Sequence, residues 1–227
     1  MYWYFYLLIG VMLFSLLAQF LVRSRFSRYD QIHARSGYTG AQAARRVLDE
    51  NGLAAISVER VSGTLSDHFS PREGVLRLSD STYDSSSVSA LGVSMHEVGH
   101  ALQLRDRYPL NQFRSSLVPV ANIGSMFGPY IALIGFFIPG NSGQTLINVG
   151  IMLFAAAVLF YIVTLPVEFN ASRRALQMLG RTGILAPDEI PYARKVLSAA
   201  GLTYVAATSA AIINLLRLIM MSRSRRR

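Results

Sequence analysis

The sequence predicts a mainly α-helical integral membrane protein with three to four transmembrane helices and a small water-exposed α+β portion. Two observations carry this prediction. The chain has 227 residues, of which 52% are hydrophobic and only 15% are charged, so it is more apolar than an ordinary soluble domain of this length. Its apolar residues also gather into several runs, each about as long as a bilayer-spanning helix.

The first apolar run, residues 1–22, is predicted to be an N-terminal transmembrane anchor. Arg23, Arg25 and Arg28 follow the run, whereas a cleaved signal peptide carries its positive charge before the apolar stretch. Because cytoplasmic flanks of membrane helices are enriched in basic residues, we expect the N-terminus on the outer side.

Residues 23–116 are polar enough to fold in water and are predicted to form a cytoplasmic portion. Thr39-Gly40-Ala41-Gln42 is a capping box for a helix that ends near Gly52. Ser85 to Ser87 supply N-cap candidates for a second helix that continues through Leu104. Two short β-type stretches lie between these helices, at Ile56 to Val61 and Val75 to Leu78.

Residues 117–165 are predicted to form a transmembrane hairpin with an uncharged turn at Pro139 to Gly143. Arginines precede and follow the hairpin, which places both of its open ends in the cytoplasm. Residues 166–201 then form cytoplasmic helices. Residues 202–227 form a C-terminal membrane helix with a basic tail. Whether this last helix spans the bilayer, is interfacial or is re-entrant stays open, because a spanning helix would put the tail outside.

The charge and cysteine content exclude several classes of function. Twenty-two basic and thirteen acidic residues give a net charge of +9, which the cytoplasmic loops of a membrane protein explain. No nucleic-acid partner is expected, because no aromatic platform or binding motif accompanies the basic residues. The absence of cysteine excludes disulfides, thiolate zinc sites and cysteine nucleophiles. A transition metal would therefore bind histidine and carboxylate ligands.

One motif on the second predicted helix carries chemistry, namely His96-Glu97-Val98-Gly99-His100. Residues four apart share one face of a helix, so His96 and His100 can present two imidazoles to one zinc ion per chain. Glu97 would lie beside the metal as a general base for an attacking water. The alternative is a chance occurrence, but unpaired histidines on so apolar a helix would be unfavourable.

A third ligand is predicted at Glu168, because the hairpin returns the chain to the face of the membrane that it left. The alternative is a carboxylate that merely stabilises a helix N-terminus. Asp106 is the main rival, but that spacing requires a helix-breaking glycine where this chain has Gln103. Other acidic residues and one histidine stay open as further candidates: Asp80, Asp84, Glu73 and His68.

His68 lies on a predicted loop and is a candidate contact for substrate or for an oxyanion. The competing interpretation is an ordinary surface histidine.

With these residues identified, the chain resembles the bacterial YugP-type neutral zinc metallopeptidases, also called membrane zinc peptidase family 2. The resemblance rests on the anchor, the hairpin and three sequence segments. These segments are Ser66-Asp67-His68-Phe69-Ser70-Pro71, Met95 to Gln103, and Leu202-Thr203-Tyr204-Val205-Ala206-Ala207. The layout is also similar to the HtpX and CAAX-prenyl membrane proteases, which supports Glu168. Those enzymes commonly have an aspartate where this chain has Ser172, so the support of the ligands should differ.

The resemblance implies a zincin-like, gluzincin-like catalytic portion and a zinc-dependent endopeptidase that acts on protein or peptide substrates. We expect it in the bacterial plasma membrane, as a multi-pass protein with its active site facing the cytoplasm. The alternatives are a non-catalytic zinc-binding scaffold and an intramembrane metalloprotease. Neither the physiological substrate nor the oligomeric state follows from the sequence.

Overall fold

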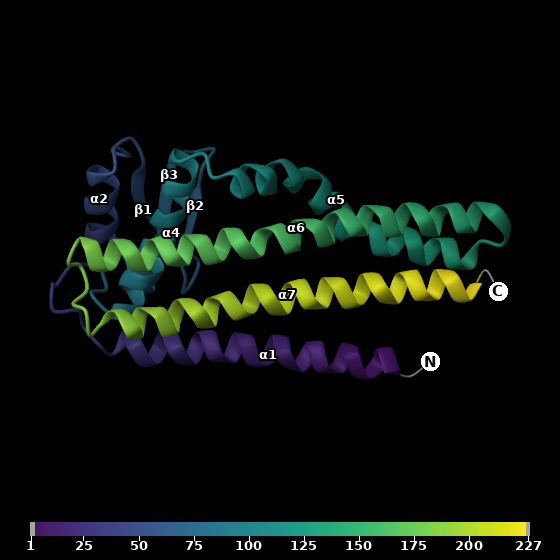
Figure 1. Ribbon diagram of the computed structural model, residues 1–227, viewed down its shortest axis with the longest axis horizontal. Helices are drawn as coiled ribbons and strands as arrows, with labels where there is room; N and C mark the ends of the chain where they lie inside the picture. The colour runs from purple at the N-terminus through teal and green to yellow at the C-terminus, as the bar shows by residue number, and fades with distance from the viewer. Residues whose placement is uncertain (1–2, 226–227) are drawn as a thin grey trace. The chain divides into compact units, whose positions relative to one another are not determined.

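The protein is described here by a computed structural model that covers residues 3–225 (Figure 1). The last two residues of the predicted basic tail, Arg226 and Arg227, lie outside the described residues, as do the first two of the predicted anchor. The elements in chain order are α1 (Trp3–Asp30), α2 (Gly40–Glu50), β1 (Ser57–Val61), β2 (His68–Ser70), β3 (Val75–Ser79), α3 (Asp80–Tyr83), α4 (Val88–Arg105), α5 (Pro109–Phe137), α6 (Gly140–Arg181) and α7 (Ile190–Arg225).

The chain divides into two compact units, which are described separately. Unit 1 contains the residues up to Leu17, the segment Pro109–Pro166 and the residues from Thr203 onward. Unit 2 contains Ala18–Tyr108 and Val167–Leu202. Helices α1, α6 and α7 each contribute residues to both units.

The structure is mainly helical, as predicted, and four of its helices are long and apolar enough to cross a membrane, which agrees with the upper end of the predicted number. Their candidate spans are Phe5–Asp30, Pro109–Phe137, Gly140–Arg181 and Ile190–Arg225. Helix α4, which carries the HEVGH motif, is not among them in the described part of the chain.

Two of these helices are longer than predicted. The sequence separated an apolar segment from a polar helix at residues 165–167 and again at 199–202, but α6 and α7 each pass through without a break. Pro166 lies inside α6, and Gly201 lies inside α7. A helical glycine is only about 1 kcal/mol less favourable than alanine, so packing can override the local signal. The expected domain boundaries at 165/166 and 201/202 therefore fall inside continuous helices, close to the residues at which the chain passes from one compact unit to the other.

Unit 1 packs through small residues. A Cβ atom placed on Gly124 of α5 would lie 2.1 Å from the carbonyl oxygen of Leu153 on α6. A Cβ atom on Gly150 would lie 2.5 Å from the carbonyl oxygen of Gly128. The two helix backbones therefore approach each other directly. Such close approach through small residues is typical of helices that pack within a bilayer.

Unit 2 contains a three-stranded sheet in the order β1-β3-β2. Strand β1 is parallel to β3, and β2 is antiparallel to β3, so β2 is an edge strand. Gly74, with a φ of +69°, completes the turn between β2 and β3 in a conformation that favours glycine. The predicted β-type stretches correspond to β1 and β3. Strand β2 was missed, because three residues are too few to show an alternating pattern.

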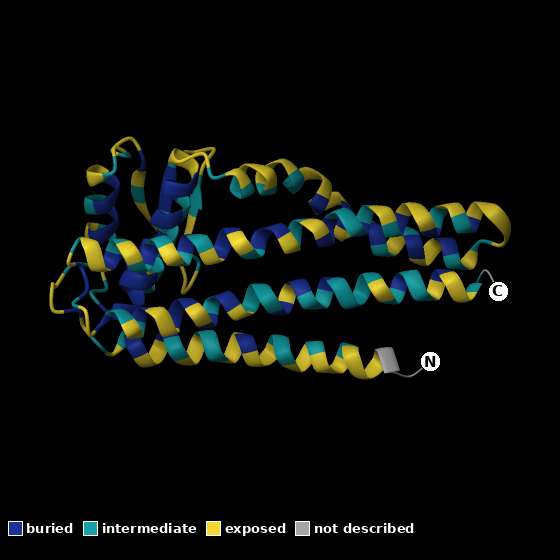
Figure 2. Cartoon of the chain, viewed as in Figure 1, coloured by how far each residue is buried: buried dark blue, intermediate teal, exposed yellow. Residues whose placement is uncertain are grey.

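Helices α2 and α4 begin at the predicted caps. Thr39 and Gln42 form a complete capping box at α2. The side chain of Ser87 accepts a hydrogen bond from the backbone N–H of Ala90 at the start of α4. Helix α4 and strand β3 are mostly buried (Figure 2). Together they form much of a core whose large, fully buried side chains include Leu48, Leu76, Leu78, Leu91, Met95 and Leu179.

Candidate metal centre

The HEVGH motif lies in the second half of α4 and presents both histidines on one helix face. His96 and His100 are four residues apart, and their ring centroids are 4.9 Å apart. Glu168, from the part of α6 that belongs to unit 2, faces them and is only 3% exposed. All three residues therefore belong to the same compact unit.

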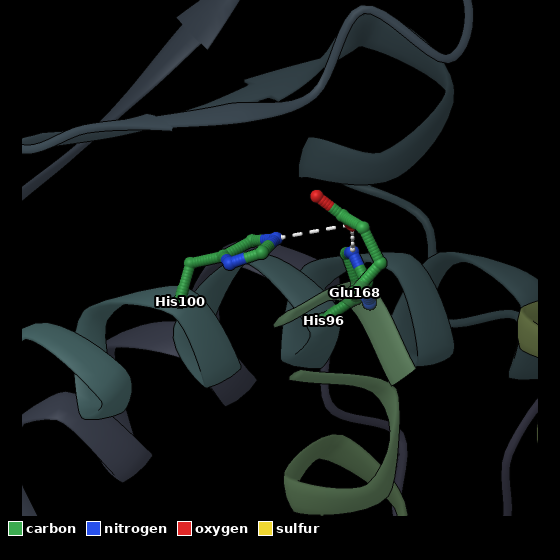
Figure 3. A group of neighbouring side chains, drawn as sticks. All are labelled: His96, His100 and Glu168. Atoms are coloured by element: carbon green, nitrogen blue, oxygen red, sulfur yellow. Dashed lines mark hydrogen bonds and ion pairs between the residues drawn. The ribbon is translucent and has the colours of Figure 1, made fainter. Parts of the chain in front are cut away.

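Both imidazoles direct their Nε2 atoms at one carboxylate oxygen (Figure 3). Oε2 of Glu168 lies 3.2 Å from Nε2 of His96 and 3.4 Å from Nε2 of His100. One potential ligand atom from each residue lies within 4.8 Å of the others. Two imidazole nitrogens and one carboxylate oxygen are a donor set that suits zinc, so we call these three residues the candidate metal centre.

The centre depends on a close approach between α4 and α6 at Gly99. A Cβ atom on Gly99 would lie 2.6 Å from the carbonyl oxygen of Ala171, closer than real contacts allow. Glycine at the fourth motif position thus lets the two helix backbones touch. The contact lies one residue before His100 on α4 and, at Ala171, three residues after Glu168 on α6. Any larger side chain would push the histidines away from the carboxylate.

His100 is supported by a buried amide. Its Nδ1 lies 3.0 Å from Oε1 of Gln103, whose side chain is fully buried. Nε2 of Gln103 donates to the carbonyl oxygen of Val167 at 2.8 Å and to Oδ1 of Asn170 at 3.0 Å. Because the Val167 carbonyl can only accept, the amide nitrogen must face it, and Oε1 must face His100. Nδ1 of His100 then carries a proton, which leaves the Nε2 lone pair for a metal.

The amide network continues to the surface of unit 2. Oδ1 of Asn170 also accepts a hydrogen bond from Nε of Arg174 at 2.9 Å. Arg174 in turn forms an ion pair with Asp106. A chain of polar contacts therefore runs from Asp106 through Arg174, Asn170 and Gln103 to His100.

His96 is supported by a hydroxyl group. Its Nδ1 lies 3.1 Å from Oγ of Ser172. The position at which similar membrane proteases have an aspartate is thus occupied here by a serine that contacts His96. Ser172 is one turn of α6 after Glu168, so the same helix supplies both the carboxylate and the partner of His96.

Glu97 is half-buried on α4 and contacts the sheet. Its Oε2 accepts a hydrogen bond from the backbone N–H of Phe69 in β2 at 3.0 Å. Burial raises the pKa of Glu97 above its usual range, and the carboxylates of Glu168 and Asp67 act in the same direction. The two histidines oppose this shift.

The rival ligands are engaged elsewhere. Asp106 is the C-cap of α4, and its hydrogen bonds to Arg105 and then to Arg174 lower the pKa of its carboxyl group. Asp80 and Asp84 contact Arg60. Glu73 forms an ion pair with Arg77.

His68 does not join the candidate metal centre. The residue is exposed on β2, and its Nδ1 lies 2.9 Å from the carbonyl oxygen of Ser66. The metal cluster found among the described residues consists of the two α4 histidines and Glu168. A contact between His68 and substrate stays a prediction.

Sequence reasoning missed three participants. Gln103 and Asn170 support His100, and the backbone of Phe69 contacts Glu97. A polar residue at position 103, on an otherwise apolar helix face, was the available signal for the first of them.

Comparisons with known proteins identify the family of the chain. The sequence matches the family described as "Putative neutral zinc metallopeptidase" over residues 4–223. It is 45% identical over 218 residues to the "Putative membrane protease YugP" of Bacillus subtilis (strain 168), with 96% of each chain covered. No solved structure matches. The chain therefore belongs to the neutral zinc metallopeptidase family of membrane proteins that the sequence resembled.

Proposed function

We propose that the protein is a membrane-bound, zinc-dependent endopeptidase with one zinc ion per chain, held by His96, His100 and Glu168. The observation that carries the proposal is the convergence of both Nε2 atoms on one buried carboxylate oxygen, beside Glu97. When bound there, zinc would acidify a water molecule and polarise a peptide carbonyl.

Glu97 performs the proton transfers in this proposal. Its carboxylate takes a proton from the attacking water as the new C–O bond forms, and it later gives that proton to the leaving amine as the peptide C–N bond breaks. The raised pKa of Glu97 suits this role, because the carboxyl group must hold the proton between the two steps.

Strand β2 is the proposed docking edge for the substrate. It pairs with β3 on one side only, and the backbone N–H of Phe69 points at Glu97 rather than at β3. An extended peptide added along that outer edge would lie beside the general base. His68, on the same strand, is the proposed side-chain contact for the substrate.

The proposed orientation places the active site in the cytoplasm and the chain in the bacterial plasma membrane. Its support is the distribution of arginines. Arg105 and Arg107 lie just before α5, and Arg173, Arg174 and Arg181 lie in the part of α6 that belongs to unit 2. Basic flanks of this kind are retained on the cytoplasmic side.

The first experiment measures zinc per chain in detergent-purified protein. We expect about one zinc ion in the parent and loss of that ion in His96→Ala and in Glu168→Ala. The matched control is His33→Ala, because His33 is exposed and contacts Ser86 rather than the centre. Absence of zinc from the parent after reloading, or equal zinc in all variants, contradicts the proposed centre.

A second experiment separates the peptidase from a zinc-binding scaffold. Glu97→Gln should retain zinc but cleave an unfolded protein substrate about 10²- to 10⁴-fold more slowly, the range that general acid–base catalysis contributes. Cleavage at the parental rate would remove Glu97 from the mechanism and leave the scaffold as the better account.

A further inference from the structure

A groove lies between α6 and α7 within unit 2, next to the candidate metal centre but outside it. Its volume is about 350 Å³, enough for a group the size of a lipid headgroup. On α6 it is lined by Phe169, Ser172, Arg173 and Leu176, which recur at helical spacing on one face. The α7 side is lined by Arg194, Leu197, Ser198, Gly201 and Leu202.

The groove has exposed apolar side chains at one end, and its two arginines lie farther along, where Leu176 and Leu197 also line it. The two helices are antiparallel here, because Gly201 lies against the ring of Phe169 while Gly180 lies near Ile190. Phe169 and Leu202, which are 46% and 37% exposed, therefore share one end.

The basic side chains lie farther along the two helices. At about 1.5 Å per residue, Arg173 lies roughly 6 Å along α6 from Phe169, and Arg194 lies roughly 12 Å along α7 from Leu202. Both guanidinium groups are thus set back along the groove from Phe169 and Leu202.

The two arginines are available for a ligand. Within residues 3–225, neither guanidinium forms an ion pair or a hydrogen bond, whereas Arg174, one residue after Arg173, is paired with Asp106. Both side chains are exposed on their helices. Two free guanidinium groups in one groove attract a phosphate group.

The apolar end of the groove lies where the apolar part of each helix meets its polar part. The apolar run of α6 ends at Leu165, and the apolar run of α7 begins at Leu202. Both helices are long and apolar enough to cross a membrane. Phe169 and Leu202 therefore lie where acyl chains begin, and the arginines lie beyond them, where phosphate groups are expected.

We propose that this groove binds one anionic phospholipid, with its phosphate between Arg173 and Arg194 and the start of its acyl chains against Phe169 and Leu202. The lipid would also touch Ser172, whose hydroxyl contacts Nδ1 of His96. A structural lipid would thus lie directly behind one of the proposed zinc ligands.

The test uses the full chain in detergent and short-chain dioctanoyl phosphatidylglycerol, with binding followed by native mass spectrometry. We expect one phosphatidylglycerol per chain, bound more tightly than dioctanoyl phosphatidylcholine. Arg173→Gln combined with Arg194→Gln should weaken phosphatidylglycerol binding about 30-fold, which corresponds to about 2 kcal/mol for two basic contacts.

The matched control combines Arg181→Gln with Lys195→Gln, which removes the same charge from α6 and α7 outside the groove. This control should bind phosphatidylglycerol as the parent does. A second variant, Ser198→Trp, fills the groove, keeps both arginines and should also lose the lipid. Urea unfolding reports whether each variant retains its fold. Neither that measurement nor lipid binding requires zinc or cleavage, so the proposal can fail independently of the proposed peptidase.

Three results would overturn the lipid site. The first is that phosphatidylglycerol binds the charge-removed and groove-filled variants as tightly as the parent. The matched control could lose as much affinity as the arginine variant, which would indicate unspecific attraction. Inorganic phosphate could bind as tightly as phosphatidylglycerol, which would make the groove a simple anion site.

Discussion

The two histidines of the candidate metal centre are held in different ways. His100 contacts Gln103, a fully buried amide that is fixed by two further acceptors. His96 contacts the hydroxyl of Ser172, which is half-exposed and lines the groove between α6 and α7. The buried side fixes which nitrogen of its imidazole carries the proton, whereas a hydroxyl can donate or accept. The His100 side should therefore be the rigid half of the centre, and the His96 side the adjustable half.

The largest loss of zinc affinity is expected from a change at Gln103. Gln103→Leu removes the acceptor for Nδ1 of His100, and we expect zinc to bind about 10- to 100-fold more weakly, as is usual when the partner of a metal ligand is lost. The zinc dissociation constant is measured by competition with a chelator.

Ser94→Ala is the matched control for that change. Ser94 is also fully buried on α4, but its hydroxyl donates to the carbonyl oxygen of Gly40 at 2.7 Å, away from the centre. Both variants should lose stability, and only Gln103→Leu should lose zinc affinity. Equal zinc affinity in the two variants would contradict the proposed role of Gln103.

The next largest effect is a dependence of zinc affinity on pH, which arises from protonation of His100. Burial alone would lower the pKa of His100, but the hydrogen bond to Glu168 and the charge of Glu97 raise it overall. Zinc requires the neutral imidazole, so zinc affinity should fall as the pH falls, by up to about tenfold per pH unit for one proton.

The metal-free protein should show the opposite slope. A raised pKa in the folded state contributes stability that is fully present below the unfolded pKa and is lost as the pH rises through the folded pKa. Zinc titrations and urea unfolding at matched pH values measure the two slopes. Slopes of the same sign would remove His100 from the explanation.

A smaller loss is expected on the adjustable side. Ser172→Ala removes one hydrogen bond of about 0.5–1.5 kcal/mol and should weaken zinc binding about 2- to 10-fold. Ser172→Asp offers His96 a charged acceptor and should restore the affinity. Ser198→Ala is the control, since that serine lines the same groove without a contact to His96. A larger loss at Ser172 than at Gln103 would reverse the comparison.

The smallest effect is expected at the outer end of the amide network. Arg174→Gln breaks a partly exposed ion pair with Asp106, and such pairs contribute at most about 1 kcal/mol, so zinc should bind no more than about fivefold more weakly. Arg35→Gln breaks a more exposed arginine–aspartate pair, with Asp188, and should leave zinc affinity unchanged. Indistinguishable zinc constants for these two variants would show that the network ends at Asn170.

What could be predicted from the sequence was local. The capping box at Thr39, the N-cap at Ser87 and the shared face of His96 and His100 depend on residues within four positions of one another. Glu168 was selected from the order of chain segments, and the structure places it against both histidines. Its role as a ligand stays a proposal.

What could not be predicted depends on contacts between distant residues. The partners of Gln103 lie 64 and 67 positions away in the sequence, and the contact between Phe69 and Glu97 spans 28 positions. The same glutamine was used only to argue that α4 continues past the spacing at which Asp106 could be a ligand. Its hydrogen bonds to His100 and α6 appear only once the helices are packed.

Pro166 interrupts the backbone hydrogen bonding of α6, the helix that carries Glu168. Proline has no N–H, so α6 lacks the hydrogen bond that would reach the carbonyl of Ile162, and bending is easiest there. The residues just after Pro166 contact α4. Gln103 donates a hydrogen bond to the carbonyl oxygen of Val167, and Gly99 lies against Ala171. Retention of the carboxylate beside its histidines should therefore depend on these contacts with α4, and not on the backbone hydrogen bond that α6 lacks at Pro166.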